Sequence, residues 1–136
     1  MGDVQKFQNI KVLEKSHKVT LDVYAFTRNF PSDERFGLAA QMRRSASSIP
    51  TNIAEGSGRR SDIDFARFLE ISFCSANELE YPVFISWKLG YLDEAQYQQS
   101  WAEISEIQRM LNAFIRGLRE SGSKRLASGQ WLVASR

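Results

Sequence analysis

The chain is poor in cysteine, histidine and proline, and it lacks a long apolar run. Its single cysteine, Cys74, excludes an intramolecular disulfide and a cysteine metal cluster, and we expect a buried thiol in a reducing, cytoplasmic protein. Its single histidine, His17, has no recognisable nucleophile motif beside it, so we expect a solvated side chain in preference to a catalytic base. No apolar run reaches the roughly 18 residues of a transmembrane helix, so no membrane partner is expected.

The chain does have enough apolar material for one core, and its charges nearly balance. Of its 136 residues, 43% are hydrophobic, which suffices for one domain with a substantial core. The 18 Lys and Arg residues exceed the 16 Asp and Glu residues by a net charge of only +2. A polyanion site would therefore have to come from local clustering of charge. A di-iron bundle needs two Glu-x-x-His pairs, and the single histidine allows only one, Glu14 with His17, so we expect no metal and no other cofactor.

Apolar residues recur at intervals of three and four in several stretches, which is the period of amphipathic helices. The stretches cover residues 12–30, 38–53, 65–83 and 97–118. Turn residues such as Pro31, Gly58 and Gly90 separate them, and no alternating strand pattern is present. The short connections predict an all-α, antiparallel up-down-up-down four-helix bundle over residues 1–119. Residues 120–136 are basic and Gly/Ser-rich, and we expect them to form a flexible tail.

Two prolines fall inside the predicted helices. Pro50 lies in the second helix and Pro82 in the third. Each proline removes a backbone donor and clashes with the carbonyl four residues earlier, so we expect a kink or a local break at Pro50 and a second bend at Pro82. Ser47 and Ser48 are predicted to satisfy the backbone groups that Pro50 leaves free.

The third predicted helix carries more apolar surface than one bundle face requires. At about 100° per residue, its main stripe from Phe65 to Val83 faces the bundle, and further apolar residues lie to both sides. Self-association is the simplest way to cover them, and a scatter of exposed apolar residues is the alternative. The predicted oligomer interface comprises Phe73 and Phe84 on one side, and Ile71, Tyr81 and Ile85 on the other.

Residues 43–60, RRSASSIPTNIAEGSGRR, begin and end with an arginine pair. Arginine stays charged and presents a fork of donors that suits phosphate, so the segment indicates a polyanion site. The alternative is that these arginines are solvated or paired with Glu55, Asp62 and Asp64. The predicted nucleic-acid contacts are Arg43, Arg44, Arg59 and Arg60, with Lys124 and Arg125 of the tail as flexible additions.

The same segment resembles a known family. The runs FP at 30–31, GL at 37–38, QMRR at 41–44, SIP at 48–50 and NIAEG at 52–56 are similar to its signature. The family comprises four-helix-bundle proteins encoded in intervening sequences of bacterial 23S ribosomal RNA genes. The resemblance spans roughly residues 10–118. It marks Arg43, Arg44, Asn52, Glu55 and Arg59 as motif positions.

This resemblance implies a small all-α bundle that assembles as a homopentamer and has no catalytic activity. It also relates the chain to the accessory variability proteins of diversity-generating retroelements, which bind nucleic acid and a reverse transcriptase through a basic surface. Asn52 and Glu55 stand beside Pro50, so their role is either to hold the bent backbone or to contact RNA.

The leading interpretation is thus a non-enzymatic, oligomeric bundle that binds nucleic acid, structured RNA above all, through a basic surface. The alternative is a protein-interaction scaffold, such as a reverse-transcriptase accessory protein. An enzyme is the third interpretation, and no motif in the chain supports it.

Overall fold

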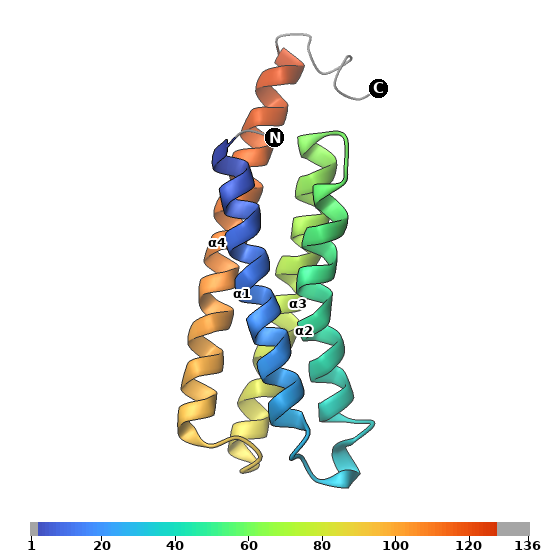
Figure 1. Ribbon diagram of the computed structural model, residues 1–136, viewed down its shortest axis with the longest axis vertical. Helices are drawn as coiled ribbons and strands as arrows, with labels where there is room; N and C mark the ends of the chain where they lie inside the picture. Colours follow the sequence, from blue (N-terminus) through green and yellow to red (C-terminus); the bar gives the residue numbers. More distant parts are fainter. Residues whose placement is uncertain (1–2, 128–136) are drawn as a thin grey trace.

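The computed structural model describes residues 3–127, with side chains as far as Lys124. These residues form α1 (Asp3–Thr27), a short 3-10 helix η1 (Ser32–Glu34), α2 (Leu38–Ser57), α3 (Asp62–Lys88) and α4 (Glu94–Ala127). They contain no strand. In Figure 1 the chain descends along α1, rises along α2, descends along α3 and rises along α4. The all-α four-helix bundle predicted from the sequence is confirmed.

The core lies along the axis of the bundle, where each helix contributes the stripe that its apolar spacing predicted. Neighbouring helices contact one another around the ring α1–α2–α3–α4, and α1 closes it against α4. The largest fully buried side chains include Met42, Ile49, Leu69, Leu79 and Phe114. Burial of such side chains contributes roughly 1.5–3 kcal/mol each and is the main stabilising term of the fold.

The helix ends follow their sequence signals. The Ser61 hydroxyl accepts the Asp64 backbone N–H at 3.1 Å and caps α3, as its spacing predicted. Asp93 and Gln96 cap α4 reciprocally, through bonds of 2.7 and 2.9 Å between each side chain and the other's backbone N–H. Gly90 adopts φ +82°, the left-handed conformation that favours glycine, and ends α3.

The prolines do not break their helices. α2 is continuous through Pro50, and α3 is continuous through Pro82. Of the two outcomes expected at Pro50, the local break is therefore wrong. At Pro50 the reason is a donor from a neighbouring helix. Proline leaves the Ala46 carbonyl without its intrahelical N–H. The Thr20 hydroxyl of α1 lies 3.1 Å from that carbonyl and 2.8 Å from Ser16 O, and it shares its one hydrogen between the two acceptors.

The next three carbonyls of α2 also accept bonds from side chains. Thr51 Oγ1 donates to Ser47 O at 2.8 Å, Asn52 Nδ2 to Ser48 O at 2.9 Å, and Ser72 Oγ of α3 to Ile49 O at 2.9 Å. The expectation for Ser47 and Ser48 is therefore wrong. The Ser47 hydroxyl donates to Arg43 O, and the Ser48 hydroxyl is bonded to that of Ser75 in α3. The turn before Pro50 is thus tied to both α1 and α3.

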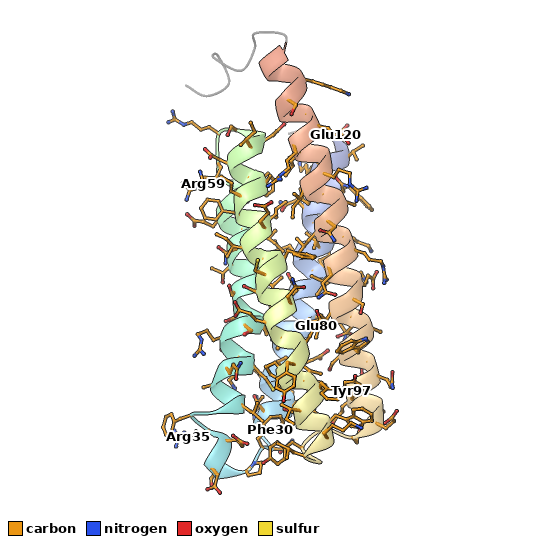
Figure 2. All side chains as sticks on the ribbon, turned by 180° about the vertical axis from the view of Figure 1, so that it is seen from behind. Phe30, Arg35, Arg59, Glu80, Tyr97 and Glu120 are labelled. Atoms are coloured by element: carbon orange, nitrogen blue, oxygen red, sulfur yellow. The ribbon has the colours of Figure 1, made fainter. Side chains whose placement is uncertain are left out.

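The apolar side of α3 that includes Phe84 is covered within the chain. Phe84 and Phe73 are half-buried against the core. The Phe84 ring contacts Tyr97 of α4, which stacks on Trp87 with centroids 4.1 Å apart. Sequence periodicity did not anticipate that aromatic residues of α4 would reach this side. Figure 2 shows Tyr97 near the end of the bundle where α4 begins.

The opposite side of α3 stays open in the single chain. Ile71 is 48% exposed and Tyr81 is 66% exposed, whereas Ile85 is half-buried. Cys74 is exposed, which corrects the expected buried thiol. The reason is helical phase: position 74 follows Ile71 by three residues on the outer face, while the buried stripe passes through Ser72 and Ala76.

α4 extends beyond the expected end of the domain. It passes through residue 120 and continues to Ala127, so residues 120–127 are helical in place of the tail that we predicted. Gly122 is buried, and a Cβ added to it would lie 2.8 Å from Ile63 Cγ1, because these turns lie close to the start of α3. The rest of the predicted tail, residues 128–136, and the side chain of Arg125 lie outside the described residues.

None of the helices within residues 3–127 is both long enough and apolar enough to cross a lipid bilayer.

The Thr20 bond to α2 makes a testable prediction. Thr20→Val keeps the shape of the side chain but leaves the Ala46 carbonyl without that donor, so it should lower the free energy of unfolding by about 1–3 kcal/mol. Pro50→Ala restores an N–H at the same place. The cost of Thr20→Val should therefore fall in the Pro50→Ala background, as measured by urea unfolding of the four proteins of the cycle. Equal costs in both backgrounds would contradict the assignment.

A matched pair of glycines tests the close approach of α2 and α3. A Cβ at Gly56 would lie 2.7 Å from Phe68 Cβ and 2.8 Å from Phe65 Cδ1, whereas a Cβ at Gly117 of α4 would meet nothing within 4 Å. Gly56→Ala should therefore destabilise the bundle by about 1–3 kcal/mol. Gly117→Ala should stabilise it by about 0.5–1 kcal/mol through helix propensity. Thermal unfolding should show melting temperatures shifted in opposite directions, and two shifts of the same sign would contradict this packing.

Candidate nucleic-acid interface

Arg43 is a half-buried arginine that neutral groups hold in place. Its Nε donates to Thr27 Oγ1 at 2.8 Å, and its guanidinium lies 4.9 Å from the centroid of the Tyr24 ring. Within the described residues no carboxylate pairs with it. Its two terminal nitrogens therefore carry a positive charge that is positioned but not neutralised by an ion pair.

Arg44 follows on the outer surface of α2. Its side chain is exposed, and among residues 3–124 it forms neither an ion pair nor a side-chain hydrogen bond. An exposed guanidinium of this kind can approach phosphate without first breaking a protein contact. Arg43 and Arg44 thus place adjacent positive charges at one level of the bundle.

Arg59 is neutralised in part, which is what the alternative interpretation expected. Its Nη2 lies 2.8 Å from Glu55 Oε1 one turn earlier, and its guanidinium covers the Phe68 ring at 4.4 Å. Both members of this ion pair are substantially exposed, so the pair contributes little to stability. Arg60 is exposed beside it and lines a shallow pocket of about 290 Å³ together with Ser61 and Arg59. Asp64, on the same pocket, pairs with Arg67 at 3.2 Å.

The arginine pairs do not form one cluster. Arg43 lies fourteen residues before Ser57, the last residue of α2, which is about 21 Å along the helix, and Arg59 follows that end. Figure 2 shows Arg59 at one end of the bundle and Arg35 at the other. Lys124 is exposed on the last described turn of α4, so it belongs to the end that includes Arg59. The basic surface therefore has two parts joined by the length of α2.

Sequence reasoning missed two basic residues. Arg28 and Arg35 lie on either side of the Phe30-Pro31 turn and line one pocket with Arg43. The Phe30-Pro31 turn could have indicated them, because a chain reversal between two helices brings the residues on either side of the turn beside the start of the second helix.

Asn52 belongs to the architecture of α2. It is half-buried, and its Nδ2 contacts both the carbonyl and the hydroxyl of Ser48. Glu55, by contrast, is exposed and pairs with Arg59. Of the two residues, only Glu55 adjoins the basic surface.

Two of the four lysines of α1, Lys15 and Lys18, are held in ion pairs. Lys18 lies 2.5 Å from Glu103 of α4 and 2.9 Å from Asp22, and Lys15 lies 3.2 Å from Glu106. The hydrogen bond to Glu103 is the main cause of the raised pKa of Lys18, and the bond to Asp22 adds to it. These lysines join α1 to α4 and are not available to a polyanion.

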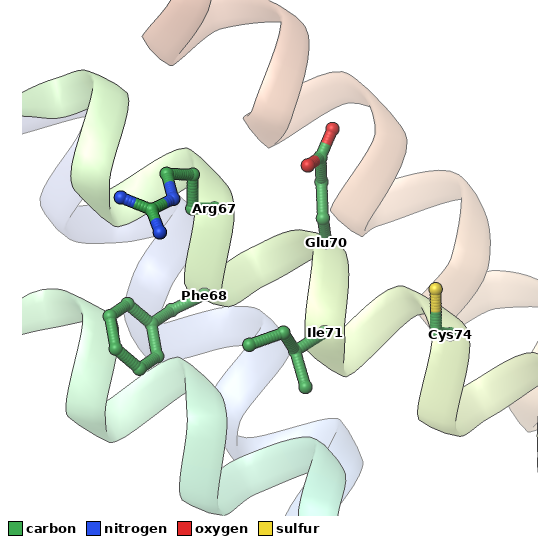
Figure 3. Close-up of a pocket in the computed structure, with 5 residues that line it drawn as sticks. All are labelled: Arg67, Phe68, Glu70, Ile71 and Cys74. Carbon is green, nitrogen blue, oxygen red and sulfur yellow. The ribbon is translucent and has the colours of Figure 1, made fainter.

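A second candidate surface is the outer face of α3. Figure 3 shows a hollow there lined by Arg67, Phe68, Glu70, Ile71 and Cys74, with a volume of about 410 Å³. With Tyr81 further along the helix, this face presents apolar side chains to solvent.

Among the described residues we find no grouping of side chains that is typical of a catalytic site. His17 is exposed on α1, in agreement with the expected solvated side chain, and it has no hydrogen-bonded carboxylate there. No group of three or more His, Cys, Asp and Glu side chains within the described part of the chain gathers to hold a metal ion.

These features define a small all-helical bundle whose second helix presents arginines at two levels. The sequence model of the 23S rRNA-intervening sequence protein family matches residues 8–113, and the chain belongs to that family, which confirms the resemblance noted from its motif.

Among solved structures, the chain is similar to a protein of unknown function of the S23 ribosomal protein family from Bacteroides thetaiotaomicron VPI-5482. The two share 26% sequence identity with a TM-score of 0.74, over 80% of this chain and 98% of the other. No curated protein matches the chain.

Proposed function

We propose that this protein is a non-enzymatic, oligomeric bundle that binds structured RNA through the basic surface of α2. The observation that carries the proposal is the pair Arg43 and Arg44, whose charges have no carboxylate partner among the described residues. An arginine that is held in place by Thr27 and Tyr24 loses little freedom when it binds phosphate.

The layout of the charges favours an extended polyanion. Arg43 and Arg44 lie in α2, and Arg59 and Arg60 follow its last residue, Ser57, about 21 Å from Arg43 along the helix axis. This span suits successive phosphates of a nucleic acid better than one small anion. Phosphate contacts give affinity without sequence choice, so structure in the RNA is the expected basis of selection. Assembly into an oligomer, a homopentamer by the family resemblance, would repeat the surface and multiply a weak contact.

The name of the family, with its reference to 23S rRNA, is consistent with RNA as the partner. DNA is the alternative polyanion, and the binding experiment below distinguishes it by direct competition.

A salt titration tests this proposal. Arg44→Gln removes an exposed charge without disturbing a protein contact, and it should reduce the slope of log K against log salt by roughly 0.7–0.9. Arg116→Gln removes an equal charge from the exposed face of α4 and serves as the matched control. Filter binding of a structured RNA, with duplex DNA as competitor, measures both slopes. An unchanged affinity and slope for Arg44→Gln would contradict the proposal.

Glu55 offers a change in the opposite direction. Glu55→Gln removes the partner of Arg59 from the surface without altering the core, because both side chains are exposed. RNA affinity should therefore rise by a few-fold at low salt, and the gain should fade at high salt. Lower affinity in the same filter-binding assay would mean that Glu55 itself contacts RNA.

A protein-interaction scaffold, such as a reverse-transcriptase accessory protein, is the second candidate. The exposed side of α3, with Ile71 and Tyr81, favours it, because large apolar side chains exposed on one helix face are typical of a protein contact. The same face is the proposed interface between copies of this chain.

Sedimentation velocity tests self-association through this face. Ile71→Asp/Tyr81→Asp should shift the protein to the sedimentation coefficient of a monomer, since charge is costly in a buried interface. Phe36→Asp is the control, because Phe36 is 88% exposed and lies on the loop before α2. Wild-type protein that sediments as a monomer would remove self-association from the proposal and leave the face to another protein.

A further inference from the structure

The turn between α1 and α2 forms a pocket in which three arginines meet. The pocket has a volume of about 330 Å³ and is lined by Thr27, Arg28, Phe30, Pro31, Ser32, Arg35, Ala39 and Arg43. No acidic residue lines it. Three arginines and no carboxylate line this hollow, so its charge favours an anion.

The backbone of the turn is fixed, so the arginines start from defined positions. The Arg28 backbone N–H donates to Tyr24 O at 3.2 Å, and that of Arg35 donates to Ser32 O at 3.1 Å. Phe30 is buried, and its ring contacts Tyr91, in the turn between α3 and α4 at the same end of the bundle, with centroids 5.2 Å apart. A site on a fixed backbone loses less entropy when it binds a ligand than a site on a mobile loop.

The nearby acid is held away from the pocket. Glu34 Oε1 accepts the Leu38 backbone N–H at 3.4 Å, and Glu34 Oε2 accepts the Tyr91 hydroxyl at 3.3 Å. Gly37 makes room for this arrangement, because a Cβ there would lie 2.7 Å from Glu34 Oε1. The carboxylate is thereby bound to the start of α2 and to Tyr91. Asp33, the other acid of the turn, is exposed and does not line the pocket.

Arg43 gives the pocket a prearranged donor. Its Nε is used by Thr27, and this bond leaves the two terminal nitrogens for a ligand. A guanidinium in this state presents parallel N–H donors that match two oxygens of a phosphate. Arg28 and Arg35 are exposed and can reach the same ligand from the turn. The Arg35 guanidinium lies 5.5 Å from the centroid of the exposed Phe36 ring in the free protein and would leave that ring to do so.

We propose that this three-arginine pocket binds a phosphomonoester dianion, such as the terminal phosphate of an RNA strand that lies along α2. A phosphomonoester carries a charge of about −1.5 to −2 at neutral pH, whereas each backbone phosphodiester carries −1. Three arginines with no acid among them therefore complement the dianion better. The location of the pocket is consistent with a terminal phosphate, because the pocket lies at the α1–α2 turn, where the row of basic residues along α2 stops. This inference rests on the proposed function for its RNA source, and a free phosphate compound is the other source of the same chemistry.

Two RNA strands of identical sequence, one with a 5′-phosphate and one with a 5′-hydroxyl, test the proposal by fluorescence anisotropy. Wild-type protein should bind the phosphorylated strand about tenfold more tightly. Arg28→Gln/Arg35→Gln should abolish that preference, and both residues are exposed, so folding is preserved. Arg109→Gln/Arg116→Gln removes the same charge from the exposed face of α4 and should keep the preference. Equal affinity of wild type for both strands, or a preference that survives in the turn variant, would overturn the pocket.

A second measurement separates this inference from RNA binding in general. Inorganic phosphate is titrated into the protein, and the Arg43 Nε–H signal is followed by NMR. If phosphate shifts this signal in the wild type but not in the Arg28→Gln/Arg35→Gln variant, the pocket binds phosphate. Should neither RNA strand bind in that case, the proposed function fails and the pocket stands. RNA binding without a 5′-phosphate preference and without an Arg43 shift overturns the pocket and leaves the proposed function standing.

Discussion

The arrangement of the bundle depends on one constraint: Pro50 has no backbone N–H, so the Ala46 carbonyl needs a donor from outside α2. That donor is the Thr20 hydroxyl of α1, and the following carbonyls of α2 accept side chains from α2 itself and from Ser72 of α3. A buried carbonyl without a donor would cost about 1–3 kcal/mol. Satisfying these groups fixes α2 between its two neighbours at one level, and core packing then follows on both sides.

This constraint separates architecture from function within residues 43–60. Asn52 and Ser48 serve the turn before Pro50, and Gly56 lets α3 approach closely. The arginine pair at its start points to another use, because Arg43 and Arg44 have no carboxylate partner in the part of the chain that the structure describes. The most distinctive sequence in the chain therefore shapes the helix, and the charges at its borders are what the helix presents.

Much of the fold could be predicted from sequence, because helical spacing and caps are local signals. The stripe of α3 and the Ser61 cap are examples. Features that depend on contacts between helices could not be predicted. Nothing in the sequence around Thr20 indicates that its hydroxyl reaches α2. The sequence likewise does not show that Tyr97 of α4 lies beside Phe84. The three-arginine pocket could not be predicted for the same reason, since Arg28, Arg35 and Arg43 line one pocket only because the chain reverses between α1 and α2.

The central claim is that the protein assembles and that the assembly binds structured RNA. Light scattering coupled to size-exclusion chromatography, with and without RNA, measures both properties on the same sample. The account predicts a molar mass that is a multiple of one chain for the protein alone, and a heavier species containing both components once RNA is added. A mass equal to one chain, unchanged by RNA at low salt, would contradict it.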